Sequence, residues 1–132
     1  MNRKKHSSHK DRVLIVEDEL SIRTNLSVRL RNEGFQVSLA EDWTEAVEAQ
    51  IQNRPEIVIL DLNLPGVPGE NLASYFQRDC NIPVVIYSAY VDRTELAELS
   101  DASAFVPKTA PYEYLTAVLK SCLSAARQKQ CV

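Results

Sequence analysis

Residues 56–69, Glu56-Ile57-Val58-Ile59-Leu60-Asp61-Leu62-Asn63-Leu64-Pro65-Gly66-Val67-Pro68-Gly69, join a run of apolar, mostly β-branched residues to a carboxylate and a loop rich in proline and glycine. The continuous apolar run predicts a strand buried on both faces, like a central strand of a parallel sheet. Two Pro-Gly pairs predict turns directly after it. Asp61 is therefore expected at the carboxyl end of a central strand, where open α/β sheets bind ligands. Because an isolated aspartate there is more often a loop cap, the rest of the chain has to decide its role.

Length and charge limit the classes of protein that fit. The chain has 132 residues, enough for one domain with its own core. Residues 1–12 hold five Lys/Arg and one Asp, so the remaining residues have ten basic and seventeen acidic side chains, a net charge of −7. This acidic body argues against direct nucleic-acid binding by the folded part.

Cysteine usage and hydropathy indicate the compartment. Cys80, Cys122 and Cys131 lack the spacing of a metal site, and no apolar stretch follows the charged N-terminal residues as in a signal peptide, so we expect reduced thiols. No apolar run approaches the roughly 20 residues that a membrane span needs. We therefore expect a cytoplasmic protein with no membrane contact.

Hydrophobic periodicity predicts five strands that alternate with five helices. The strands are expected at residues 13–16, 35–39, 57–60, 83–87 and 104–106. Apolar stripes predict helices at residues 22–30, 46–51, 72–76, 96–99 and 115–123. The first helix is expected to end at Gly34, the second to begin with a capping box of Asp42 and Glu45, and the last to begin near Pro111.

This alternation predicts an α/β fold with helices on both faces of a parallel sheet. The expected architecture is flavodoxin-like (βα)5, a doubly wound five-stranded parallel sheet in the order 2-1-3-4-5. Residues 1–10 are expected to be a disordered basic tail, residues 11–127 the domain, and residues 128–132 a short C-terminal tail.

Polar side chains come directly after four of the predicted strands. They are Glu17 and Asp18, Asp61, Ser88 and Lys108. Because the carboxyl ends of parallel strands lie at one edge, these side chains are expected to meet in one crevice. Three crowded carboxylates need a cation, and oxygen ligands favour a hard divalent ion such as Mg²⁺. A carboxylate can also accept a phosphoryl group, whose charge Lys108 would offset while the Ser88 hydroxyl donates to it.

These residues resemble the receiver domain of bacterial two-component response regulators, the CheY-like superfamily, over residues 11–127. The resemblance rests on Leu14-Ile15-Val16-Glu17-Asp18-Glu19, Asp61-Leu62-Asn63-Leu64-Pro65-Gly66 with Gly69, Ser88-Ala89, and Phe105-Val106-Pro107-Lys108. It implies that Asp61 is the phosphoacceptor for a phosphoryl group from a histidine kinase. It also implies that Mg²⁺ is bound by Glu17, Asp18, Asp61 and the backbone carbonyl of Asn63, and that Lys108 and Ser88 contact the phosphoryl group.

The resemblance also implies a switch. Ser88 would move toward the phosphoryl group, the ring of Phe105 would follow, and the face made by the fourth helix, fifth strand and fifth helix would change its binding preference. The chain departs from the family at Thr109, where proline usually comes after the lysine, and at residues 101–103, which lack the usual glycine. Tyr90 is a bulky residue two positions after Ser88.

Several functions stay open at this stage. The main expectation is a switch without its own output domain that catalyses only its own phosphorylation and dephosphorylation. Its partners would be a sensor histidine kinase or a histidine phosphotransfer protein and an unidentified downstream protein, with a phosphorylation-dependent homodimer left open. The alternatives are a degenerate receiver that serves only as an interaction module, and a haloacid-dehalogenase-like phosphatase, which would need a second aspartate where Asn63 stands. Three glycines leave no phosphate-cradling loop for a nucleotide.

Overall fold

The structure is a computed structural model that describes residues 10–66, 69–89 and 102–130. Along the chain it contains β1 (Arg12–Val16), α1 (Leu20–Asn32), β2 (Gln36–Ala40), α2 (Trp43–Asn53), β3 (Ile57–Leu60), α3 (Gly69–Ser74), the π-helical turn η2 (Tyr75–Asp79), β4 (Val84–Ser88), β5 (Ala104–Pro107) and α5 (Tyr112–Gln130). The helix expected at residues 96–99 and Tyr90 lie outside the described residues.

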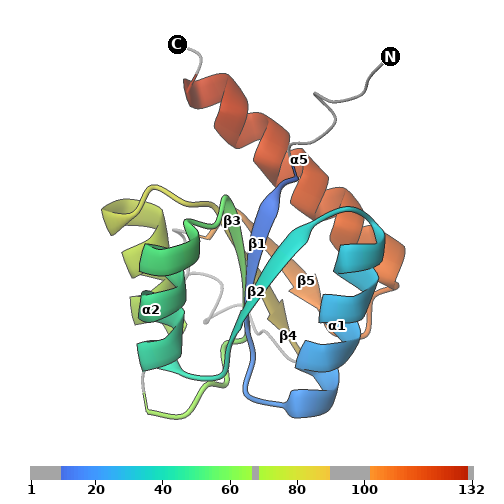
Figure 1. The fold of residues 1–132 in the computed structure, drawn as a ribbon, viewed down its shortest axis with the longest axis vertical. Helices are drawn as coiled ribbons and strands as arrows, with labels where there is room; N and C mark the ends of the chain where they lie inside the picture. Colours follow the sequence, from blue (N-terminus) through green and yellow to red (C-terminus); the bar gives the residue numbers. More distant parts are fainter. Residues whose placement is uncertain (1–9, 67–68, 90–101, 131–132) are drawn as a thin grey trace.

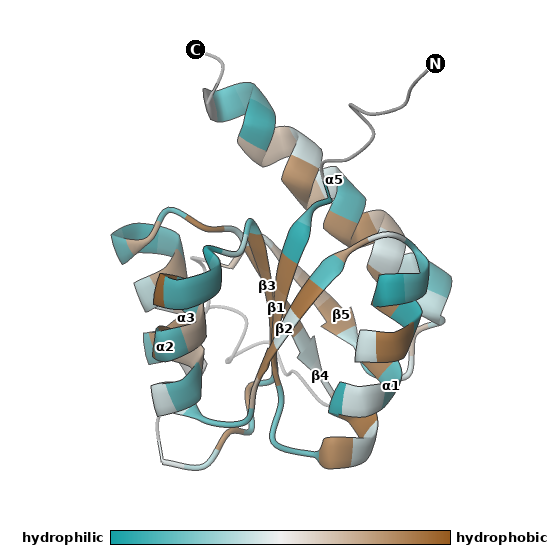
Figure 2. Ribbon diagram, in the orientation of Figure 1, coloured by the Kyte–Doolittle hydropathy of each residue, from teal (hydrophilic) through white to brown (hydrophobic). Residues whose placement is uncertain are grey.

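The five strands form one parallel sheet in the order β2-β1-β3-β4-β5, which confirms the predicted flavodoxin-like fold (Figure 1). Alternate residues of β1 face opposite sides. Val13 and Ile15 pack in a core with residues of α1 and α5, and Leu14 and Val16 in a second core with residues of α2 and α3. Figure 2 shows hydrophobic strands enclosed by helices that are largely polar on their outer sides.

The predicted ends of the first two helices are confirmed. Gly34 has a left-handed backbone, φ 98°, and Phe35 N–H donates to the Leu30 carbonyl at 3.0 Å, so the helix stops where glycine allows the turn. At the start of α2, the Asp42 carboxylate accepts from Glu45 N–H at 2.9 Å. Glu45 Oε1 in turn accepts from Glu41 N–H at 2.9 Å, one residue earlier than in a standard capping box.

Two details of the predicted helices are wrong or incomplete. Ile51 is predicted on the buried face of α2 but is 64% exposed, whereas Ala46 and Ala49 are buried. At roughly 100° per residue, Ile51 lies about 140° around the helix from Ala46, which puts it on the outer face. The third helix continues into η2, where Gln77 Oε1 accepts from Val84 N–H at 2.8 Å. This contact ties the end of the helix to the start of β4, and apolar periodicity gives no signal for it.

The last helix is longer than its apolar stripe. Leu115, Leu119 and Leu123 are buried against the sheet, as predicted. α5 continues to Gln130, past residue 127, and its second half passes beside the start of β1 at the amino-terminal edge of the sheet (Figure 1). No helix in the described ranges is long and apolar enough to cross a membrane.

Candidate functional site

The carboxyl edge of the sheet holds the predicted site residues because the ladder continues one residue past three strands. Glu17 N–H donates to the Ala40 carbonyl at 3.0 Å, Asp61 N–H to the Val16 carbonyl at 3.0 Å, and Lys108 N–H to the Ser88 carbonyl at 2.9 Å. These bonds fix the backbones of Glu17, Asp61 and Lys108 at the ends of β1, β3 and β5. The side chains are therefore positioned by the sheet rather than by a mobile loop.

Lys108 bridges two buried carboxylates. Its Nζ lies 2.7 Å from Glu17 Oε1 and 3.2 Å from Asp61 Oδ2. The side chains of Glu17 and Asp61 are only 3% and 4% exposed, and that of Lys108 is 16% exposed. Charges this far from water interact more strongly than surface pairs, so the ammonium is the main counter-charge of both carboxylates.

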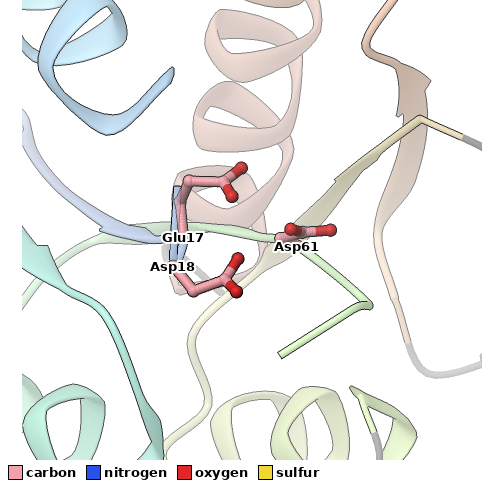
Figure 3. A group of neighbouring side chains, drawn as sticks. All are labelled: Glu17, Asp18 and Asp61. Carbon is pink, nitrogen blue, oxygen red and sulfur yellow. The ribbon is translucent and has the colours of Figure 1, made fainter. Parts of the chain in front are cut away.

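Three carboxylates surround a position suited to a metal ion. One ligand oxygen from each of Glu17, Asp18 and Asp61 lies within 4.8 Å of the others. Figure 3 shows Glu17 and Asp18 at the end of β1, beside Asp61. Glu17 Oε1 is buried, and its near cation among the described residues is Lys108 Nζ at 2.7 Å. A set of three carboxylates that supplies only oxygen ligands, with an exposed Asp18 that can keep water nearby, fits Mg²⁺.

Burial changes the proton affinity of Glu17. Loss of water around the side chain raises its pKa to about 7, and the Asp61 charge adds to this, while hydrogen bonds from Lys108 and Glu19 N–H oppose it. Lys108 has a raised pKa, because attraction to Glu17 and Asp61 outweighs the lowering effect of burial. Without a metal ion, the site is therefore short of positive charge near neutral pH.

The raised pKa of Glu17 predicts how the ion-free protein responds to pH. Between pH 4.5 and about 7, folded Glu17 keeps a proton that the unfolded chain has released, so its contribution to stability falls as the pH rises. Glu17→Gln removes this titration. In the presence of a metal chelator, we expect the free energy of unfolding of the variant, relative to that of the wild type, to rise by about 2–3 kcal/mol over that pH range and to stay level above it. Denaturant unfolding at a series of pH values measures this difference. Parallel stability curves for the two proteins would contradict the assignment.

Of the remaining predicted site residues, Asn63 and Ser88 lie at the same edge, and Phe105 lies two positions further back along the sheet. Asn63 is exposed, and its backbone N–H donates to Asp61 Oδ1 at 3.2 Å. Ser88 is fully buried at the end of β4, and Phe105 is half-buried in β5 opposite Ile86. Since Ser88 is two residues after Ile86, Ser88 and Phe105 face the same side of the sheet.

One neighbour of the site is not predicted from the sequence. Arg23 of α1 donates from Nη1 to the Glu17 carbonyl at 2.7 Å and pairs through Nη2 with Glu41 at 3.5 Å. The hydrogen bond to the Glu17 carbonyl connects α1 to the end of β1. Its position six residues after Glu17, on the first turns of the helix, is the only signal that the sequence offers, and any amphipathic helix offers the same.

The order of the strands and the residues at the carboxyl edge of the sheet define a flavodoxin-like domain with an acidic site that contains a lysine. The family model of the response regulator receiver domain matches residues 13–120, and the chain belongs to this family. Receiver domains are signalling switches that bind Mg²⁺ at an acidic pocket and interact with histidine kinases or phosphotransfer proteins. This chain has an acidic cluster formed by Glu17, Asp18 and Asp61.

Known proteins similar to the chain agree with this family. It is 34% identical to the DNA-binding response regulator MtrA of Mycobacterium tuberculosis over 87 residues, 66% of this chain and 38% of MtrA. It is 36% identical to the transcriptional regulatory protein PdtaR of the same species over 102 residues, 76% of this chain and 50% of PdtaR. The signal receiver domain of a putative LuxO repressor from Vibrio parahaemolyticus superposes with a TM-score of 0.84 at 25% identity, over 93% of this chain and 97% of that one. The chain thus spans half or less of the length of the two curated relatives.

Proposed function

We propose that the chain is a phosphorylatable switch in which Asp61 accepts a phosphoryl group from a phosphohistidine. The observation that supports this most strongly is Lys108 Nζ, held between Asp61 Oδ2 at 3.2 Å and Glu17 Oε1 at 2.7 Å. A lysine fixed at a buried aspartate supplies the counter-charge that an added phosphoryl group needs. The donor would be a sensor histidine kinase or a histidine phosphotransfer protein.

The contacts of Asp61 support a mechanism for the transfer of the phosphoryl group. One oxygen of the Asp61 carboxylate attacks phosphorus, the bond from phosphorus to the histidine nitrogen breaks, and the imidazole keeps the electron pair. The Asn63 N–H on Oδ1 and the Lys108 ammonium near Oδ2 orient the carboxylate for that attack. Mg²⁺, held by Glu17, Asp18, Asp61 and the backbone carbonyl of Asn63, would neutralise the charge of the phosphoryl oxygens.

The switch would run from Ser88 to Phe105. The buried Ser88 hydroxyl would donate to a phosphoryl oxygen, and the space it leaves on that face of the sheet would admit the ring of Phe105. The shared face of these two residues, set by the pairing of β4 with β5, supports this coupling. The surface of β5, α5 and the helix expected at residues 96–99 would then change its preference for a downstream partner.

The two alternatives have less support. A haloacid-dehalogenase-like phosphatase needs an acid two residues after its nucleophile, and residue 63 is an asparagine, whose backbone N–H donates to Asp61. Burial of charged side chains costs free energy, and a degenerate receiver would gain no activity in return. The buried contacts of Lys108 with Glu17 and Asp61 therefore favour a phosphoacceptor site over a degenerate receiver.

A small-molecule phosphodonor tests the proposal directly. After incubation with acetyl phosphate and Mg²⁺, we expect intact-mass spectrometry to show one phosphoryl group that is stable in acid and lost in base. Chelation of Mg²⁺ before the donor is added should prevent the adduct, because the carboxylates alone repel the donor. Absence of an adduct would favour the degenerate receiver, and continuous release of phosphate from unrelated monoesters would favour the phosphatase.

A further inference from the structure

A cationic cavity lies at the opposite edge of the sheet from Asp61. It has a volume of about 340 Å³ and lies between the start of β1, the end of α2, the loop before β4 and the second half of α5. Three arginines line it, Arg12, Arg54 and Arg127. Among the described lining residues, Glu56 is the one acidic side chain. This region is thus positively charged on a domain whose body is acidic overall.

Glu56 forms ion pairs with two of the three arginines, Arg12 and Arg127. Its Oε1 accepts from Arg12 N–H at 3.0 Å and lies 3.5 Å from Arg12 Nη1, and its Oε2 lies 3.7 Å from Arg127 Nη2. Arg127 also pairs with Asp11, outside the cavity lining. Three arginines against these two carboxylates still leave an excess of positive charge. The fixed carboxylate limits the movement of two arginines, so less freedom is lost when a ligand binds.

Arg54 is the third arginine, and it makes no ion pair with any residue that the structure describes. It ends α2 with a left-handed backbone, φ 48° and ψ 62°, a conformation that favours glycine and is uncommon for arginine. The end of α1 meets the same need with Gly34. The Arg54 carbonyl accepts from Arg12 Nε at 2.8 Å, which joins the strained turn to the cationic cluster.

The second strained residue lines the same cavity. Within the described ranges, Arg54 and Asn81, with φ 57°, are the two non-glycine residues with a positive φ. Asparagine tolerates this conformation better than arginine does. Strained backbone is retained mostly where the surrounding site depends on it, and ligand clamps are among such sites. Among the described residues, the charge of Arg54, which has no ion pair, and the strained backbones of Arg54 and Asn81 are therefore found at the same cavity.

From this coincidence we propose that the cavity binds a small polyanion that bears two or more phosphate or carboxylate groups. Guanidinium groups form paired hydrogen bonds with both kinds of anion. The volume falls in the range of small-ligand sites and would hold a single compact molecule. The site is separate from the phosphoacceptor edge, so occupancy here does not require phosphorylation of Asp61.

Calorimetric titration of the full chain in chelator, with pyrophosphate in one arm and citrate in the other, tests this proposal. Sodium chloride at matched ionic strength controls for general screening. We expect saturable binding at one site. Binding of pyrophosphate alone assigns a phosphate ligand, binding of citrate alone a carboxylate ligand, and binding of both a site that selects by charge. Heat without saturation, or the same response to sodium chloride, would overturn the proposal.

Arg54→Gly separates charge from folding. Glycine suits the left-handed turn, so the variant is expected to fold at least as well as the wild type while it binds the anion about tenfold more weakly. Lys120→Gln is the control, because it removes one positive charge on the exposed face of α5, outside the cavity lining, and it should keep wild-type affinity. Equal binding by Arg54→Gly and wild type, or an equal loss in Lys120→Gln, would refute the site.

Amide spectra locate the ligand independently of affinity. Pyrophosphate should shift the amide signals of residues 54, 56, 81–82 and 123–127 and leave those of residues 17–18 and 61–63 unchanged. Shifts confined to the carboxyl edge would mean that the anion binds at the phosphoacceptor site, which would contradict the proposal.

Discussion

Asp61→Asn is expected to abolish phosphorylation, with no adduct detected by intact mass after incubation with acetyl phosphate and Mg²⁺. The amide has nearly the shape of the carboxylate and can still accept from Asn63 N–H, which now donates to Oδ1 at 3.2 Å. It has lost the negative charge that makes the oxygen nucleophilic, and it removes one of the three carboxylates of the metal site. The fold should remain, because removal of one of two buried like charges relieves repulsion with Glu17.

Asp42→Asn is the matched control for this result. Asp42 caps α2 by accepting from Glu45 N–H at 2.9 Å, and asparagine caps helices about as well as aspartate. The control therefore makes the same chemical change outside the site and should be phosphorylated at the wild-type rate. A persistent adduct in Asp61→Asn, mapped by fragmentation to Asp18 or Glu17, would show that the wrong carboxylate has been assigned.

The part of the site that the sequence predicts is the part that backbone geometry fixes. Parallel strands bring their carboxyl ends together, so Glu17, Asp61 and Lys108 could be assigned to one edge before any side chain was placed. The ladder bond from Asp61 N–H to the Val16 carbonyl is the local reason why that assignment holds. Once the order of the strands is known, the residue directly after each strand can be assigned to the same edge.

The rest depends on packing and strain, which leave little trace in residue patterns. Arg54 stands where glycine would be expected, so a pattern search assigns no special backbone to it. The π-helical turn at Tyr75–Asp79 adds no change in apolar composition. Each of these features is set by tertiary contacts rather than by local preference.

Lys108→Met should have the second-largest effect, and it should act on two measurements in opposite directions. Methionine keeps most of the length and apolar volume of the side chain but removes the ammonium that lies 2.7 Å from Glu17 and 3.2 Å from Asp61. We expect the rate of phosphorylation at saturating Mg²⁺ to fall about a hundredfold, the scale for loss of one positioned charge partner in a reacting site. Mg²⁺ should bind more tightly, because the ammonium no longer competes for the same carboxylate oxygens.

The free energy of unfolding, measured in the presence of a metal chelator, gives a third and independent test of the same contact. Without Lys108, Glu17 and Asp61 are two buried carboxylates with no cation between them, and we expect a loss of about 3 kcal/mol in the free energy of unfolding at neutral pH. Added Mg²⁺ should restore most of that loss, because the ion takes over the role of counter-charge. Lys120→Met is the control, since its Nζ pairs with Glu33 at 3.4 Å on a side chain that is 63% exposed and such surface pairs contribute little. If Lys108→Met lowered the phosphorylation rate and Mg²⁺ affinity together, Lys108 would have to support the metal site rather than compete with it, and the role proposed for it would be wrong.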